Sequence, residues 1–203
     1  LTYELRVRVH NIENPTQFTS YKTDFSNANF SSSESIAYDG INYWVGDAFT
    51  SYVEKLDGNN PSNSIFSGNL TYAVRELSYG FYEGKPAIFA GQGDFLGNHS
   101  LYTFSTTPNN GSFPLIKKLD GPWDFLYGMD YENGKIYTIS RRASENSKLH
   151  RHSFKDLSRE KSWDIPPYSS ESPYTKTGLV IKGNDVYMTT VNNEIVRYIF
   201  EAK

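Results

Sequence analysis

Apolar and polar residues alternate with a period of two along much of the chain. The clearest examples are residues 5–9, 135–139 and 194–199. This alternation predicts β-strands with one buried face and one polar face. Clusters of Gly, Asn, Asp and Pro separate the segments, and no window of a dozen residues carries an apolar stripe at helical spacing. The sequence therefore predicts a nearly all-β protein.

One pattern occurs four times: a small residue, an apolar strand, a glycine turn and a second strand with an aromatic residue. The copies begin at residues 35, 80, 128 and 178, which are 45, 48 and 50 residues apart. Third strands follow at Tyr52–Leu56, Leu101–Phe104, Leu149–Phe154 and Ile195–Ile199, and fourth strands are expected near Ser64–Phe66, Phe113–Leu119 and Lys161–Ile165. Repeats of about 40–50 residues are typical of four-stranded propeller blades. We therefore expect a small four-bladed β-propeller that occupies residues 1–203 as one domain.

The last repeat has only three strands, and the segment Thr2–Val9 belongs to none of the repeats. Because an unpaired strand edge is costly, we expect Thr2–Val9 to close the ring as the outermost strand of the final blade. A five-bladed ring would need residues 14–33 to supply most of a blade, and that segment is too polar. The alternative is an open meander or a sandwich in which the repeats are accidental.

The segment Tyr-Trp-Val-Gly-Asp at 43–47, followed by Val-Glu-Lys-Leu-Asp-Gly-Asn at 53–59, resembles one repeat of the YWTD or NHL propeller families. The other three repeats match these families in outline. The resemblance implies a propeller and a binding role, and it carries no catalytic residue across. Members of those families normally have six blades, which is more than this chain can supply.

Composition narrows the possible functions. Of the 203 residues, 37% are hydrophobic and 16% aromatic, so we expect a core of Tyr and Phe, with Tyr43, Phe89, Tyr137 and Tyr187 packed between sheets. A net charge of −3 argues against nucleic-acid binding, and no apolar stretch is long enough for membrane insertion. The absence of cysteine excludes disulfides, thiolate nucleophiles and Cys-ligated zinc.

Non-repeated residues in the loops at one end of the blades are the candidate ligand-binding residues, because the scaffold does not need them. They are Arg75, Glu76, Asp94, Phe95, Trp123, Asp124, Arg141 and Tyr174. The pair Trp123-Asp124 suits sugar recognition, since a flat ring can cover the apolar face of a pyranose while a carboxylate binds its hydroxyls. Alternatively, Trp123 fills the junction between the second and third blades.

These observations favour an extracellular or cell-surface binding module with a glycan, or else a protein partner, as its ligand. Sequons at Asn29, Asn69, Asn98 and Asn110 permit glycosylation and secretion, although their number is what chance supplies. One alternative is a carbohydrate-active hydrolase or lyase with a carboxylate pair drawn from Glu76, Asp94 and Asp124. Another is a structural domain that docks onto other polypeptide, which an exposed contiguous apolar patch would favour.

No catalytic residue, cofactor or metal site is predicted. His150 and His152 alternate along one strand, a spacing that two zinc ligands could have. No acidic residue stands nearby to complete a ligand set, and an exposed strand face explains the pair equally well.

Overall fold

The structure, a computed structural model, is all-β. It describes residues 6–10, 14, 16–22, 33–47, 50–93, 99–121, 125–141, 147–156, 158–165, 176–190 and 195–200. Three antiparallel sheets have four strands each, and a fourth sheet has three. Blade one is β3 (Ser33–Tyr38), β4 (Tyr43–Asp47), β5 (Tyr52–Leu56) and β6 (Ser64–Asn69). Blade two is β7 (Glu76–Tyr82), β8 (Lys85–Gly93), β9 (His99–Ser105) and β10 (Leu115–Gly121). Blade three is β11 (Phe125–Glu132), β12 (Lys135–Arg141), β13 (Lys148–Ser153) and β14 (Arg159–Asp164), and blade four is β15 (Lys176–Lys182), β16 (Asp185–Thr190) and β17 (Ile195–Ile199).

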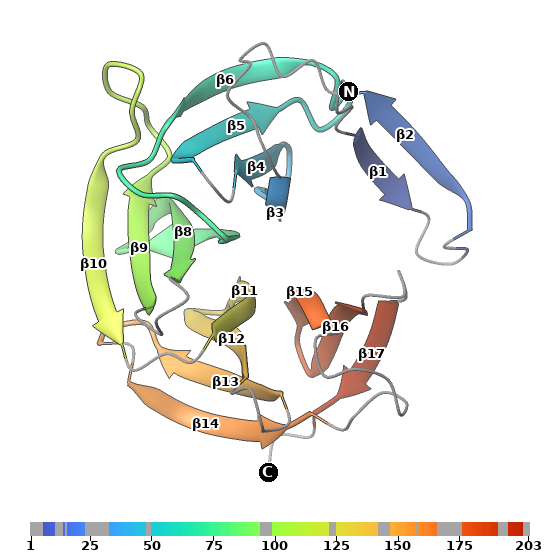
Figure 1. The fold of residues 1–203 in the computed structure, drawn as a ribbon, viewed down its shortest axis with the longest axis vertical. Coiled ribbons are helices and arrows are strands. Elements are labelled where there is room, and N and C mark those ends of the chain that lie inside the picture. The colour runs from blue at the N-terminus through green and yellow to red at the C-terminus, as the bar shows by residue number, and fades with distance from the viewer. Residues whose placement is uncertain are drawn as a thin grey trace.

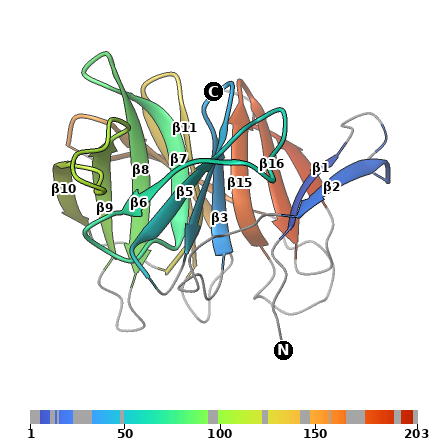
Figure 2. The same cartoon turned by 90° about the horizontal axis from the view of Figure 1, so that it is seen from above.

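The blades are arranged around an axis as a β-propeller, with the first strand of each blade innermost (Figure 1). The first strands contact one another in order, β3 with β7, β7 with β11, and β11 with β15. Viewed from the side, the strands run between the two faces of the ring (Figure 2). The predicted fold class and the predicted fourth strands of the first three blades are confirmed.

Local sequence explains the tight turn between the first and second strands of each blade. In blades two and three this turn has two residues, Glu83-Gly84 and Asn133-Gly134, and all four have positive φ, between 50° and 76°. Turns with positive φ at both positions match the twist of paired strands, which is why glycine occupies the second position. Blade one has a longer turn in which Asp39 accepts hydrogen bonds from the amides of Ile41 (2.9 Å) and Asn42 (2.6 Å).

The core consists of separate apolar clusters between neighbouring blades. Trp44 and Val53 of blade one pack with Ile88 and Phe104 of blade two. The second cluster joins blades two and three, and the third joins blades three and four. Trp44 is almost fully buried and contacts the edge of the Phe113 ring at 5.6 Å between centroids. Stacked sheets with apolar residues on both faces therefore replace the single core of a sandwich.

Of the aromatic residues expected in the core, Phe89 is fully buried, whereas Tyr43, Tyr137 and Tyr187 are half-buried. The strand registers place Trp44 opposite Lys55, as Tyr137 stands opposite Arg151 and Tyr187 opposite Arg197. The residue of blade one that corresponds to the two tyrosines is thus Trp44 and not Tyr43. The sequence alignment chose Tyr43 because it did not allow for the longer turn between the first and second strands of blade one, which changes the position of each residue along the second strand.

The expected closure of the ring by Thr2–Val9 is wrong for the part of that segment that the structure describes. β1 (Arg6–His10) pairs antiparallel with β2 (Phe18–Lys22) in a separate two-stranded sheet, and not with β17. Pairing within a short hairpin costs far less loop entropy than pairing with a strand nearly two hundred residues away. β2 also shows that the polar segment 14–33 can form a strand. The β1–β2 hairpin lies in the sector of the ring between blades four and one (Figure 1).

Candidate functional site

One end of the ring gathers the points where first strands begin and second strands end, which we call the loop-rich end. In blade two Glu76 stands opposite Gly91, in blade three Phe125 stands opposite Arg141, and in blade four Lys176 stands opposite Thr190. Because the first strands contact one another in sequence, three blades present the same strand ends to the same side. The sheets therefore bring residues that are far apart in sequence to one face.

Arg75 and Glu76 are the predicted binding residues that the structure describes most fully. Both are half-buried, Glu76 as the first residue of β7 and Arg75 directly before it, and the Arg75 amide donates a 3.0 Å hydrogen bond to the Gly91 carbonyl. The backbone that carries this cation and this carboxylate is therefore held by the edge of blade two. A guanidinium and a carboxylate at adjacent positions can donate and accept hydrogen bonds with the hydroxyls or amides of one ligand.

The structure places Arg141 as the last residue of β12, again at the loop-rich end. The predicted residues Asp94, Phe95, Trp123, Asp124 and Tyr174 lie outside the described residues. In sequence, Asp94 directly follows β8 and Asp124 directly precedes β11. The structure thus brings Arg75, Glu76 and Arg141 to one end of the ring. Whether Trp123 contacts a sugar or fills the junction between the second and third blades stays a prediction.

A half-buried carboxylate, Asp130 on β11, joins three blades at the inner wall of the ring. Its Oδ1 accepts hydrogen bonds from the Ser78 hydroxyl of β7 (3.1 Å) and from the Tyr131 amide (2.8 Å), and its Oδ2 accepts one from the Ile181 amide of β15 (2.7 Å). Burial raises the pKa of Asp130 to about 6, although these hydrogen bonds act in the opposite direction. All of these contacts are between blades or within β11, so Asp130 holds the ring together.

A second carboxyl group, Glu54 on β5, is fully inaccessible to solvent, and neither of its oxygens has a hydrogen-bond partner among the described residues. It stands opposite Val45, on the face of blade one where Val7 of β1 packs against Val45 and Leu56. Burial raises the pKa of Glu54, and the nearby Ser64 hydroxyl offsets this only in part. A neutral carboxyl group suits this apolar interface better than a carboxylate.

The two alternating histidines, His150 and His152, are buried in blade three and do not form an exposed strand face. His150 Nδ1 lies 2.7 Å from the Ser162 hydroxyl, and His152 Nε2 lies 3.0 Å from the Thr138 hydroxyl. Within the described part of the chain, no group of three or more His, Cys, Asp or Glu residues could hold a metal ion. The pair is therefore part of the packing between sheets.

A cation on the third strand recurs opposite the aromatic residue of the second strand, each time with an acidic partner. In blade one Lys55 lies over the Trp44 ring at 4.9 Å and 3.1 Å from Asp39, whose pKa is lowered because four hydrogen bonds outweigh its burial. In blade four Arg197 pairs with Asp185 at 2.8 Å. These ion pairs are satisfied within the scaffold.

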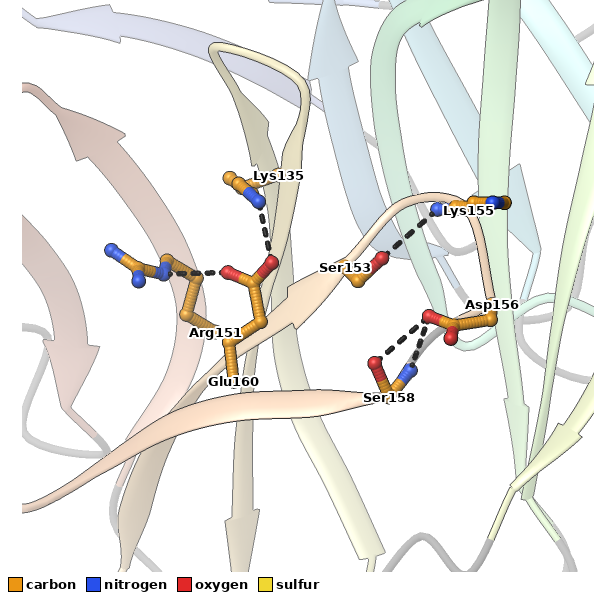
Figure 3. A network of polar contacts seen from close by, with 7 residues as sticks. All are labelled: Lys135, Arg151, Ser153, Lys155, Asp156, Ser158 and Glu160. Carbon is orange, nitrogen blue, oxygen red and sulfur yellow. Dashed lines mark hydrogen bonds and ion pairs between the residues drawn. The ribbon is translucent and has the colours of Figure 1, made fainter.

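Blade three shows the same arrangement with the acidic residue on its outermost strand. Glu160 of β14 accepts a 3.0 Å hydrogen bond from Arg151 and also pairs with Lys135, which lowers the pKa of its carboxyl group (Figure 3). In the adjoining turn Asp156 accepts hydrogen bonds from the amide and hydroxyl of Ser158 (Figure 3). The exposed side of this blade is thus tied together by charges that stay accessible to solvent.

Sequence reasoning missed Asp130 and Glu54. The signal for Asp130 was present, because the registers align it with Ala37, Gly80 and Val180, so one repeat has a carboxylate where the other three have an apolar residue or glycine. Glu54 lies in the strand sequence Tyr-Val-Glu-Lys-Leu, where nothing distinguishes it from an ordinary exposed residue of a strand. The sequence also did not reveal that β1 packs on the same face of blade one.

No family model and no curated protein sequence matches this chain. Solved structures do resemble it, at low sequence identity. A glutaminyl cyclase from Myxococcus xanthus aligns with a TM-score of 0.63 and 13% identity, covering 93% of this chain and 80% of the cyclase. The Cps50 (Swd1) β-propeller domain of Myceliophteria thermophila aligns with a TM-score of 0.54 and 9% identity over 96% of this chain. A streptogramin B lyase aligns with a TM-score of 0.51 and 13% identity over 98% of this chain.

These likenesses show the propeller fold and nothing finer, and they do not single out the YWTD or NHL families. This chain covers only 62% of the Swd1 domain and 63% of the lyase. Because proteins with the same fold perform different functions, the fold by itself assigns no function to this chain. No described helix is long and apolar enough to cross a membrane.

Proposed function

We propose that this chain is a binding module, secreted or at a cell surface, whose ligand occupies the loop-rich end of the ring. The proposed ligand is a glycan, with a protein partner as the next choice. The proposed contacts are Arg75, Glu76, Asp94, Phe95, Trp123, Asp124, Arg141 and Tyr174. No nucleic acid, membrane insertion, metal or cofactor enters the proposal.

The observation that carries the proposal is the convergence of strand ends from three blades at the loop-rich end. Glu76 begins β7 there, directly after Arg75, and Arg141 ends β12 there, so charged residues from two sheets lie at one end of the ring. Elsewhere, Asp130, His150 and His152 are hydrogen-bonded inside the scaffold. A rigid scaffold that presents polar and aromatic loop residues at one end is the usual form of a binding surface.

Glycan-array binding tests the proposal, with Arg75→Ala, Glu76→Ala and Trp123→Ala as the variants. Lys182→Ala is the matched control, because Lys182 is exposed at the opposite end of β15. We expect the wild type and the control to bind the same glycans, and each of the three variants to bind about tenfold or more weakly. If the array is blank and pulldowns recover no protein partner, or if the variants bind like the control, the loop-rich end is not a binding site.

The second candidate function is a carbohydrate-active hydrolase or lyase, in line with the two enzymes among the similar folds. Its carboxylate pair would come from Glu76, Asp94 and Asp124. Alanine at a catalytic carboxylate lowers turnover by orders of magnitude, whereas alanine in a lectin site lowers affinity gradually. Hydrolysis and lyase assays on wild type and Glu76→Ala therefore separate the two functions, and turnover that Glu76→Ala abolishes would favour the enzyme.

A further inference from the structure

The sector of the ring between blade four and blade one differs from the other junctions, and we call it the open sector. At the other junctions the first strands of neighbouring blades contact each other, but no comparable contact joins β15 to β3 among the described strands. The β1–β2 hairpin occupies only the outer part of this sector (Figure 1). The two walls of the open sector are one face of blade four and one face of blade one.

On the blade-four wall, side chains are exposed at positions that are buried or half-buried in the other blades. The registers align Ile195, opposite Thr189, with Leu149, opposite Ile139, and with Val53, opposite Gly46. Val53 and Leu149 are 0% and 1% exposed because the next blade covers them, whereas Ile195 is 59% exposed. Val180 is likewise 57% exposed, and its counterpart Ala37 only 8%. Blade four therefore keeps an apolar face of the kind that elsewhere forms an interface.

The blade-one wall shows the same contrast from the other side. Ile36 of β3 aligns with Met129 of β11 and Leu179 of β15, which face the preceding blade. Met129 and Leu179 are 3% and 7% exposed, whereas Ile36 is 52% exposed. Both walls thus carry the apolar positions that a neighbouring sheet covers everywhere else in the ring.

Among the described strands, one strand edge is also open at this sector. β1 lies nearer to the axis than β2 (Figure 1), and β2 is its only partner among the described strands. An inner edge with unpaired N–H and C=O groups can pair with an added strand. On blade four, the cation Arg197 already forms an ion pair with Asp185, so an occupant of this sector needs no acidic residue to neutralise it.

We propose that the open sector binds a β-hairpin of a partner protein. The hairpin inserts between β15 and β3, pairs with the inner edge of β1, and has aliphatic or aromatic residues on both of its faces. Strands buried on both faces are apolar at nearly every position, and the exposed residues on the two walls require the same here. The interfaces already present between blades continue into this sector, which is why a sheet and not a helix is the occupant. The inference is independent of the ligand at the loop-rich end.

A synthetic peptide with the sequence of residues 176–190 is a suitable probe for this sector. In the ring, those residues form β15 and β16 and pack against the face of blade three that holds Tyr137 and Leu149. Blade four repeats that face with Tyr187 and Ile195, so the same hairpin fits it. Binding of the fluorescently labelled peptide to the full chain is measured by anisotropy, with a scrambled peptide as the control.

We expect the probe peptide to bind saturably, and Val180→Lys and Ile195→Lys to bind it about tenfold or more weakly. Ile116→Lys is the matched control, because Ile116 is an exposed residue of β10 in blade two, which forms neither wall. Each of these residues is exposed, so the variants should fold with unchanged circular dichroism. Equal binding of the scrambled peptide, or unchanged binding to both wall variants, would overturn the proposal. So would self-association of the wild type that Ile195→Lys abolishes, because a second copy would then fill the sector.

Discussion

At the scale of single residues, the scaffold depends on Asp130. One carboxylate accepts hydrogen bonds from β7, β11 and β15, so three inner strands share it. Burial raises its pKa from 3.8 to about 6. Between these values the folded protein binds more protons than the unfolded chain, so this group favours folding at low pH, and its contribution is lost as the pH rises through 6.

The pH dependence of stability tests this role. A shift of this size corresponds to about 2.4 kcal/mol of unfolding free energy between pH 4 and pH 8. Other carboxyl groups, such as Asp39, have lowered pKa values and act in the opposite direction in both proteins. We therefore expect the difference in melting temperature between wild type and Asp130→Asn to fall as the pH rises from 4 to 8. A difference that does not vary with pH would contradict the raised pKa.

At the scale of the strand and its neighbours, the junction of blades two and three depends on Gly80. A Cβ at this position would overlap the Tyr131 ring. That ring cannot retreat easily, because it stacks on Phe89 at 5.2 Å and contacts Phe154 at 5.8 Å between centroids. Glycine on β7 is what lets an aromatic residue on β11 fill the space between the sheets.

The variant Gly80→Ala should lower the free energy of unfolding by about 1–3 kcal/mol, the usual cost of overpacking a core. The double variant with Tyr131→Leu should lose less than the sum of the two single variants, because the smaller side chain makes room for the added methyl group. Chemical denaturation of the four proteins measures this coupling. Additive losses would show that Gly80 does not act through Tyr131.

Elements with local signals could be predicted from the sequence. The strands of the four repeats followed from alternation and from the turns at Gly84, Gly134 and Gly183. The β1–β2 hairpin could not be predicted, because β2 contains three polar residues among five and its strand forms by pairing with β1 and packing on blade one. The burial of His150 and His152 was missed for the same reason, since it depends on which sheet covers them.

At the scale of the whole molecule, four blades and a hairpin surround one axis, and two surfaces stand out. One is the loop-rich end with Arg75 and Glu76, which sequence reasoning proposed from non-repeated loop residues. The other is the open sector, which agrees with the exposed apolar patch expected of a docking domain. Its exact walls could not be predicted, because repeat-equivalent residues such as Leu149 and Ile195 look alike in sequence and differ only in what covers them.

Hydrogen exchange tests most directly the central claim, that blade four lacks neighbouring strands that the other blades have. β13 is paired on both sides, with β12 and β14, whereas β17 is paired only with β16 among the described strands. Amides of residues 195–199 should therefore exchange about tenfold or more faster than those of residues 149–153 in the isolated protein. Equal protection of the two strands would contradict the account, because it would mean that another part of the chain already covers blade four.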